Sequence, residues 1–494
     1  MAKKLLAIDQ GTTGSTAIVL TLEGETLGKK NVEFDQHFPK PGWVEHDAEQ
    51  IWKSVEAAVE GALAASRVAG TEIGAIGITN QRETTLVWDR KSGKPVHRAI
   101  VWQCRRTSAT CDRLKAEGAE PAVRKKTGLV IDAYFSGTKV AWILDEVSGA
   151  RARADRGELA FGTIDSFLVH RLTGGDVHAT DVTNASRTLL MDLATLQWDD
   201  EMLKLFDVPA SVLPKIVPSA GPIGTTKGVG FLPDGIPITG IAGDQQAALF
   251  GQACFTEGDA KCTYGTGAFA LMNIGSKPTL STHGLITTVG WQMGSAAPVY
   301  ALEGSAFIAG AAVQWLRDGL GLIKTAPEIE ELAKKVASSE GVAFVPALAG
   351  LGAPYWDQDA RGTIVGLTRG STAAHLARAT LEGIAFEVWD LLEAMTKDAG
   401  RELASLKVDG GASRNDLLVQ FQSDVANVEV VRPVEIESTG RGAAMLAGIG
   451  AGLSDVKAAE KMVKLDRTFR PGIPASERDA HIERWRKAIA QSRA

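Results

Sequence analysis

The sequence contains few cysteines and no long apolar run. Cys104, Cys111, Cys254 and Cys262 are the only four, and they form no CxxC pair, so neither a disulfide framework nor a cysteine-rich metal site is indicated. The most apolar stretches, such as residues 342–355, are shorter than a membrane span and are broken by Gly and Pro. The N-terminus runs into a predicted strand without the apolar segment of a signal peptide. These absences predict a cytoplasmic protein with no membrane span.

A basic tract and the commonest nucleotide-binding motifs are missing as well. With 53 basic and 59 acidic residues the net charge is −6, which argues against nucleic acid as a partner. Neither GxxxxGK[ST] nor GxGxxG occurs, so neither a P-loop nor a dinucleotide fold is indicated. What remains is an ordinary globular composition, 45% hydrophobic, in a chain of 494 residues. Because single cores stop growing near ~250–300 residues, we expect two large domains.

Residues 8–15, with the sequence Ile-Asp-Gln-Gly-Thr-Thr-Gly-Ser, join two apolar runs. Two such runs around a Gly-containing turn are typical of a β-hairpin. The small residues at its tip, Gly14 among them, let backbone N–H groups approach a ligand, and Thr12 and Thr13 add hydroxyl donors. Asp9 adds one carboxylate, which suits a phosphate chain carrying Mg²⁺. The alternative is an ordinary hairpin in which Asp and Thr serve as turn formers.

A second stretch repeats this pattern in the other half of the chain. In residues 259–271 a strand leads into Tyr-Gly-Thr-Gly, with Thr266 in the turn, and an apolar strand follows. Two such hairpins, one near the start of each half, predict a duplicated fold that holds the phosphates of a nucleotide between its halves. In residues 408–415 a strand and a Gly pair ending at Gly411 precede the start of a predicted helix. A flat ring could lie against this open backbone, and Asn415 could form a hydrogen bond with the ring.

Charged and aromatic residues in the first half suit a small polyol. Arg82 and Glu83 follow an apolar strand and supply a donor and an acceptor side by side, which matches adjacent hydroxyl groups. Trp102, in an apolar strand, and Tyr134 could cover the C–H edges of the same ligand. The alternatives are a surface ion pair for the charged residues and ordinary core positions for the aromatic ones.

Asp244 is the strongest candidate for chemistry. It lies between Gly243 and Gln245, at the turn into a predicted helix. One interpretation is a structural helix N-cap. The other is a general base that takes a proton from an attacking hydroxyl group. Phosphoryl transfer needs mostly positioning and charge stabilisation, so one base, Mg²⁺ and two donor-rich hairpins would suffice.

The order of predicted elements indicates two mixed α/β halves. Residues 4–34 are predicted as a three-strand meander and residues 48–65 as an amphipathic helix. Further helices are predicted over residues 107–117, 137–147 and 372–398, the last with Ser371 as its N-cap. The Gly- and Pro-rich residues 221–240 hold the predicted transition between domains.

Over nearly its whole length the chain resembles the FGGY carbohydrate kinases, and among them the members that phosphorylate glycerol. The motifs that carry this resemblance are residues 8–13, 41–47, 80–84, 102–106, 181–188, 243–249, 264–269, 301–316, 350–356 and 408–411. It implies an α/β, actin-like and ribonuclease-H-like ATPase fold, with domains at residues 1–245 and 246–494 and a cleft between them. It also implies transfer of the ATP γ-phosphate to glycerol, giving sn-glycerol 3-phosphate, in a homo-oligomer.

The resemblance further implies a role for each matching residue. The polyol site would contain Arg82, Glu83, Trp102, Tyr134, Asp244, Gln245 and Phe269. The nucleotide site would contain Thr12, Thr13, Gly14, Thr266, Gly310, Gln314, Gly411 and Asn415. Asp9 and Asp244 would lie near Mg²⁺, with Asp244 as the base. The chain departs from the family at Thr16, where an arginine is usual, and at Gly14, where a serine is usual.

Two other functions stay open from the sequence. One is the phosphorylation of another small polyol, such as erythritol or threitol, in the same scaffold. The other is an actin-like structural ATPase, against which the predicted polyol pocket argues. ATP consumption that requires added glycerol would separate the enzyme from the structural protein, and a panel of polyols would separate the two enzymes.

Overall fold

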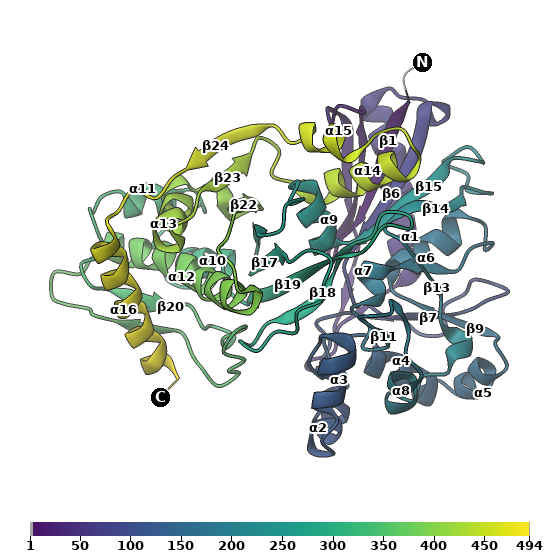
Figure 1. The fold of residues 1–494 in the computed structure, drawn as a ribbon, viewed down its shortest axis with the longest axis horizontal. Helices are drawn as coiled ribbons and strands as arrows, with labels where there is room; N and C mark the ends of the chain where they lie inside the picture. The colour runs from purple at the N-terminus through teal and green to yellow at the C-terminus, as the bar shows by residue number, and fades with distance from the viewer. Residues whose placement is uncertain (1–2, 494) are drawn as a thin grey trace.

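Two β-sheets form the centres of the two halves of the molecule (Figure 1). The structure, a computed structural model, describes residues 3–493. The first sheet has the strand order β14 (Ala220–Thr225), β15 (Pro237–Gly243), β6 (Ile73–Asn80), β1 (Lys4–Gln10), β2 (Gly14–Leu20) and β3 (Thr26–Glu33). The second has the order β18 (Ile286–Trp291), β19 (Val299–Ala306), β17 (Ala268–Asn273), β16 (Asp259–Tyr264), β22 (Ser405–Asp409), β23 (Val430–Pro433) and β24 (Leu465–Phe469).

The two sheets share one arrangement of strands. In the first sheet β3, β2 and β1 are antiparallel neighbours, whereas β1, β6 and β15 are parallel. In the second sheet β19, β17 and β16 are antiparallel neighbours, whereas β16, β22 and β23 are parallel. The hairpins β1–β2 and β16–β17 therefore occupy the same place in their sheets. The prediction of a duplicated fold is confirmed.

The strand β1 is apolar on both sides because helices cover both faces of the first sheet. Successive side chains of a strand point to opposite faces. Leu6 and Ile8 pack in the core that contains α1 (Ala48–Ser66), and Leu5 and Ala7 pack in the core that contains α14 (Ser438–Gly450). An uninterrupted apolar run followed by Asp9 is thus what this position in the fold requires.

The helix α14 comes from the second half of the sequence but lies on the first sheet. Figure 1 shows α14 and α15, in yellow, beside the purple strand β1. The helix α14 packs closely on α9 (Asp244–Gly251), and glycine permits this contact. A Cβ at Gly442 of α14 would lie 1.8 Å from the carbonyl oxygen of Ala247 in α9. The backbone that carries Asp244 is therefore held by chain from both halves. The domain boundary at residues 245 and 246 stays a prediction.

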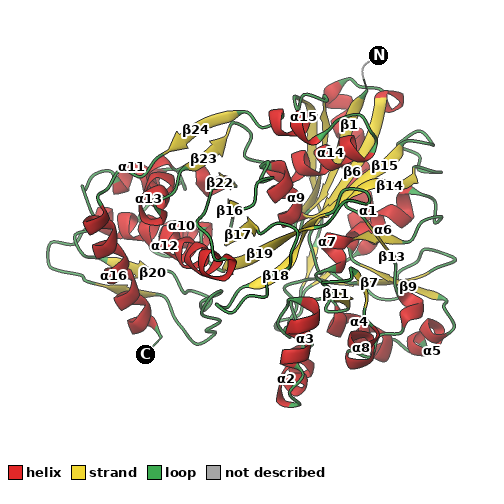
Figure 2. Cartoon of the chain, viewed as in Figure 1, coloured by secondary structure: helices red, strands yellow, loops and turns green. Residues whose placement is uncertain are grey.

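Smaller sheets and further helices complete the two halves (Figure 2). The short strands are β4 (Gln36–His37), β5 (Glu45–His46), β7 (Leu86–Asp89), β8 (Ala99–Ile100), β9 (Leu159–Gly162), β10 (Ala179–Asp181), β11 (Met191–Asp192), β12 (Gln197–Trp198), β13 (Lys215–Val217), β20 (Ala343–Val345) and β21 (Thr363–Val365). The helices are α2 (Ser108–Ala116), α3 (Glu120–Thr127), α4 (Gly137–Glu146), α5 (Ala150–Asp155), α6 (Ile164–Leu172), α7 (Val182–Ala185), α8 (Asp200–Leu205), α10 (Gly310–Asp318), α11 (Glu328–Ala333), α12 (Ala373–Ala399), α13 (Asp416–Ala426), α15 (Val456–Lys461) and α16 (Ala475–Ser492), with 3₁₀ turns η1 (Gly70–Glu72), η2 (Ala210–Val212) and η3 (Gly411–Arg414). Within residues 3–493, every helix is too short or too polar to cross a lipid bilayer.

The structure corrects three details of the sequence prediction. The N-cap of α12 is Thr372, not Ser371, because the chain turns helical one residue later. Trp102 lies in a turn after β8 rather than in a strand. The helix α3 was not predicted, since its polar sequence lacks an apolar repeat; a proline in its first turn and the left-handed C-cap Gly128 mark its ends instead.

The burial of Asp390, on α12, predicts that the stability of the protein depends on pH. Burial raises the pKa of this carboxyl group from 3.8 to about 7, although Trp485 Nε1 donates a hydrogen bond of 2.8 Å to Oδ2. Because the folded state binds the proton more tightly than the unfolded chain, this contribution to stability is fully present below the unfolded pKa and is lost as the pH rises through about 7. We expect the Tm of D390N to lie a few degrees above that of the wild type at about pH 8. Between about pH 5 and about pH 8, the Tm of D390N should also decrease less than the Tm of the wild type. Scanning calorimetry of both proteins measures this, and equal pH slopes would contradict it.

Candidate functional site

Asp244 lies where the parallel strand β15 ends and the helix α9 begins. The N-cap of that helix is Gly243, so Asp244 is its first helical residue and does not serve as the cap. Its Oδ1 accepts a hydrogen bond from the backbone N–H of Gln245 at 2.7 Å and lies 3.2 Å from Arg82 Nε. The side chain is one-third exposed, so it is held by the protein on one side and open to a ligand on the other.

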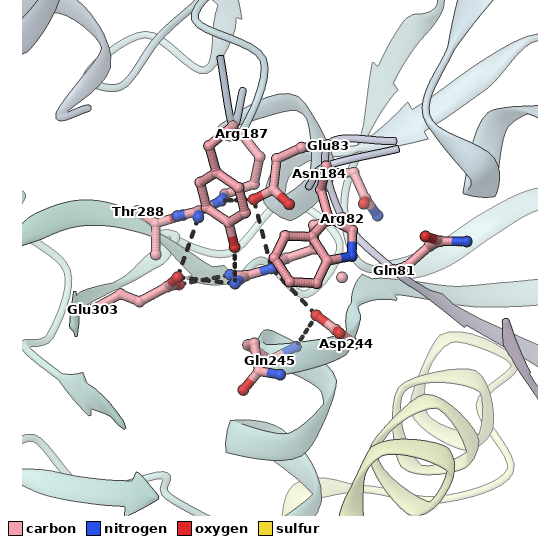
Figure 3. Close-up of polar contacts among 12 residues, drawn as sticks. Gln81, Arg82, Glu83, Asn184, Arg187, Asp244, Gln245, Thr288 and Glu303 are labelled. Carbon is pink, nitrogen blue, oxygen red and sulfur yellow. Dashed lines mark hydrogen bonds and ion pairs between the residues drawn. The ribbon is translucent and has the colours of Figure 1, made fainter. Parts of the chain in front are cut away.

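Arg82 is buried, and its guanidinium group is surrounded by acceptors. Nη1 and Nη2 donate to the two carboxylate oxygens of Glu303 at 2.6 and 2.8 Å, in a bidentate pair. Nη1 also donates to Gln246 Oε1 at 3.2 Å, and Nη2 lies 3.5 Å from the hydroxyl group of Tyr134. The edge that carries Nε faces Asp244, as Figure 3 shows. The interpretation of Arg82 as part of a surface ion pair is wrong.

Glu83 adopts a left-handed backbone conformation with φ of 57°, which is uncommon for a residue with a side chain. Its carbonyl oxygen accepts hydrogen bonds from the hydroxyl groups of Thr85 and Ser136, both at 3.0 Å, and these hold the turn. Arg187 Nε donates to Glu83 Oε1 at 2.6 Å. Burial raises the pKa of Glu83, while the charges of Arg187 and Arg82 oppose that shift.

Two aromatic side chains connect this charged group with the first hairpin. The rings of Trp102 and Tyr134 meet edge to face with their centroids 5.6 Å apart. Trp102 Nε1 donates a hydrogen bond of 3.0 Å to the hydroxyl group of Thr12, in the turn between β1 and β2. Both rings are only partly buried, so they leave apolar surface beside Arg82.

Lys261 links the remaining residues predicted for the polyol site. Its Nζ donates to Gln245 Oε1, to Thr263 Oγ1 at 2.9 Å and to the carbonyl oxygen of Phe269 at 3.3 Å. The lysine is fully buried, and burial lowers its pKa. One lysine side chain thereby joins the side chain of Gln245, on α9, to the backbone of Phe269, on β17.

Asp9 is a second carboxyl group close to Asp244. Burial, with the negative charges of Asp244 and Glu437, raises its pKa to about 7, and Lys29 opposes the shift. Among residues 3–493, no group of three or more His, Cys, Asp or Glu side chains is arranged to hold a metal ion. Asp9 and Asp244 are the two acidic groups predicted to lie near Mg²⁺, and they are close enough for the charge of Asp244 to raise the pKa of Asp9.

The residues predicted for the nucleotide site lie on the two hairpin tips and on the elements next to them. A hydrogen bond of 2.9 Å from Gly11 N–H to the Gly14 carbonyl oxygen closes the first tip around Thr12 and Thr13. At the second tip, the carbonyl oxygen of Thr266 accepts from Ala309 N–H at 2.8 Å. This bond seats the N-terminus of α10, with Gly310 and Gln314, against the hairpin.

The strand β22 brings the last two predicted residues to the same end of the second sheet. A Cβ at Gly410 would lie 2.5 Å from the carbonyl oxygen of Tyr264, so only glycine permits this close approach. The next residue, Gly411, is exposed beside the second hairpin. Asn415 caps α13 by accepting from Leu418 N–H at 2.9 Å through Oδ1, which leaves its amide N–H₂ group for a ligand.

Sequence reasoning missed Glu303, Arg187 and Lys261 as parts of the site. Glu303 is the single charged residue of the apolar strand β19, and Lys261 is a fully buried lysine in the interior of β16. A charge inside a buried strand needs a partner, and that is the signal that could have identified both. Arg187 lies in one of the motifs that carry the family resemblance, but no local pattern shows that it points toward Glu83.

Comparisons with known proteins agree with this architecture. The FGGY family of carbohydrate kinases matches with its N-terminal domain at residues 4–251 and its C-terminal domain at residues 260–451. The chain is 56% identical to a protein named glycerol kinase from Myxococcus xanthus, over 99% of both chains, and 56% identical to one from Deinococcus radiodurans, over 99% of this chain and 97% of the relative. A crystal structure of Plasmodium falciparum glycerol kinase with ADP superimposes with a TM-score of 0.94 at 38% identity, covering 99% of this chain and 98% of that one. This chain therefore belongs to the FGGY family of carbohydrate kinases.

Proposed function

We propose that this protein transfers the γ-phosphate of ATP to glycerol, giving sn-glycerol 3-phosphate. Relatives named glycerol kinase, similar over almost the whole chain, support the assignment. The observation that carries it is the contact between Arg82 Nε and Asp244 Oδ1 at 3.2 Å, which places a cation and a partly exposed carboxylate beside two aromatic rings. A small polyol needs all three: a donor, an acceptor and an apolar wall.

Each part of the site then has a role toward glycerol. Arg82 and Glu83 bind neighbouring hydroxyl groups, because one donates and the other accepts. Trp102 and Phe269 cover the carbon edge, Tyr134 adds a hydroxyl group next to Arg82, and Gln245 is held by Lys261 where it borders the substrate.

Asp244 acts as the general base. It accepts the proton of the attacking hydroxyl group while the oxygen of that group forms its bond to the γ-phosphorus and ADP leaves. Arg82 Nε, at 3.2 Å, orients the carboxylate for this task. The exposed third of the side chain is the part that reaches the substrate.

ATP occupies the other end of the site. The hairpin tips supply the hydroxyl groups of Thr12, Thr13 and Thr266 and the backbone of Gly14 to its phosphates. The nucleoside lies near Gly310, Gln314, Gly411 and the free amide of Asn415. The Plasmodium falciparum glycerol kinase structure was solved with ADP, which supports a nucleotide in this fold.

A magnesium ion fits the donors that are present. Mg²⁺ keeps several waters and binds one or two carboxylates together with substrate phosphates, so it needs no larger acidic cluster. Asp9 and Asp244 would hold it, directly or through water, next to the phosphate chain. It would neutralise charge on the phosphates, and its charge would favour the ionised form of Asp9, whose pKa burial raises.

The proposal also covers the cellular location of the protein and its partners. All four cysteines are buried free thiols, which suits the reducing cytoplasm. An assembly of several copies of this chain is proposed from the family resemblance. Nucleic acid is not a proposed partner, because the net charge is −6.

A panel of polyols tests the substrate. The two large aromatic side chains leave room for a three-carbon chain more readily than for a ring, so glycerol should exceed erythritol, threitol, pentuloses and hexoses in kcat/KM. We expect a margin of at least about tenfold, because each methylene group that a pocket must exclude is worth roughly ten- to two-hundredfold. ADP release measured with each compound gives the order. Erythritol or threitol ahead of glycerol would reassign the enzyme to that polyol.

A further inference from the structure

Arg82, Glu303, Arg187 and Glu83 form a closed ring of alternating charges, which Figure 3 shows. Glu303 lies 2.6 Å from Arg82 and 3.1 Å from Arg187. Arg187 lies 2.6 Å from Glu83, and Glu83 Oε1 lies 3.8 Å from Arg82 Nε. None of the four side chains is more than 3% exposed. Two cations and two anions thus neutralise one another inside the protein.

Two of the four residues in this ring are proposed to contact the substrate. Arg82 and Glu83 are the residues that we expect to bind the hydroxyl groups of glycerol. Glu303 lies on the opposite edge of the Arg82 guanidinium from Asp244, because it pairs with both Nη atoms while Nε faces Asp244. The pairing is a two-point contact, so it fixes the plane of the guanidinium as well as its place.

The charges in the ring keep Glu303 ionised. Burial alone would raise the pKa of Glu303, but the positive charges of Arg187 and Arg82 lower it to about 2. Arg187 is held in turn by packing, since its guanidinium lies over the rings of Tyr134 and Phe135 at 5.6 and 5.1 Å. Glu303 is on β19 of the second sheet, whereas its partners Arg82, Arg187 and Glu83 belong to the first half.

We propose that Glu303 and Arg187 are positioning residues for polyol binding. Glu303 holds the guanidinium of Arg82 with its Nε edge toward Asp244, and Arg187 holds the carboxylate of Glu83 beside it. Arg82 and Glu83, which bind adjacent hydroxyl groups, are then correctly oriented before the substrate binds. This inference rests on the proposed function, since it concerns the same polyol site.

The variant E303Q tests the positioning role. The amide keeps the shape of the side chain but loses the charge that both arginines share. We expect kcat/KM for glycerol to fall on the order of a hundredfold, because a displacement of about 1 Å at a reacting centre has an effect of that size. Most of the loss should be a rise of at least about tenfold in KM for glycerol, with KM for ATP within about twofold of the wild type.

E382Q is the matched control. Glu382, on α12, is also buried and accepts from Arg378 Nε at 3.0 Å and from Ser339 Oγ at 2.8 Å, but it is not part of the ring. Its loss of charge should leave KM for glycerol unchanged. Equal rises in KM for glycerol in E382Q and E303Q would overturn the proposal, because any buried ion pair would then have the same effect.

A double-mutant cycle shows whether Glu303 acts through Arg82. If it does, R82K with E303Q should lose little more kcat/KM than R82K alone. Losses that multiply would show that the two residues act independently and would overturn the proposal. Glycerol-dependent ADP release by the wild type is measured in parallel. If the wild type releases no ADP in response to glycerol, both the proposed function and this inference are wrong. If the wild type is active and E303Q has an unchanged KM for glycerol, this inference alone is wrong.

E303D keeps the test decisive if E303Q does not fold. The shorter side chain retains the charge, so the ring stays neutral, but it cannot meet both Nη atoms at the present distances. We expect a folded protein whose KM for glycerol lies between those of the wild type and R82K. A wild-type KM in E303D would overturn the positioning role.

Discussion

Replacing Asp244 by Asn should lower kcat at least about a hundredfold at saturating glycerol and ATP, because a general base contributes ~10²–10⁴ in rate. The amide cannot accept the proton, yet it can still accept the hydrogen bond that Gln245 N–H donates at 2.7 Å. The fold should therefore stay intact. Steady-state assays with a melting curve for each protein measure both effects.

Asp200 offers a control for this prediction. It is the first residue of α8, as Asp244 is of α9, but it is exposed and lies outside the site. D200N should keep its turnover. A near-normal kcat in D244N, or a drop in stability without a drop in turnover, would return Asp244 to a structural role at the helix start.

Replacing Arg82 by Met should have the second large effect, on activity and on stability together. Glu303 and Glu83 would lose a buried cation, and breaking such a pair costs about 3–5 kcal/mol. The hydroxyl group that Arg82 would bind also loses its donor, so we expect kcat/KM for glycerol to fall on the order of a thousandfold or more. Urea unfolding and initial-rate assays report the two effects separately.

R82K separates charge from geometry. The ammonium group keeps the ring neutral, so most of the stability should return. It cannot pair with both oxygens of Glu303, so activity should stay far below that of the wild type. A variant R82K with wild-type KM and kcat would show that the bidentate contact plays no part in binding.

Much of the fold could be predicted because its signals are local. The apolar run before Asp9 and the small residues after it determine the first hairpin within a dozen positions, and Thr266 marks the second in the same way. Arg82 and Glu83 were also visible, since donor and acceptor are adjacent in sequence. Local signals are therefore enough to predict candidate site residues that lie close together on one element.

What holds those residues together could not be predicted, because it joins distant parts of the chain. The pair of Arg82 and Glu303 spans 221 positions, and it forms only when β19 meets the turn after β6. No spacing rule encodes that meeting. The predicted N-cap of α12 was wrong for a different reason. Ser371 and Thr372 are both good cap residues, and only the path of the backbone decides between them.

The position of Glu303 limits how far the two halves of such an enzyme can be exchanged as modules. A hybrid that joined the first half of this chain to the second half of a distant relative would take the proposed nucleotide contacts of Thr12, Thr13 and Gly14 from this chain and the others from that relative. If the relative lacked an acidic residue at the position of Glu303, the hybrid would enclose two arginines with one glutamate and carry a net positive charge in its interior. Substrate preference would therefore depend on both parents, even though Arg82 and Glu83 come from the first half alone.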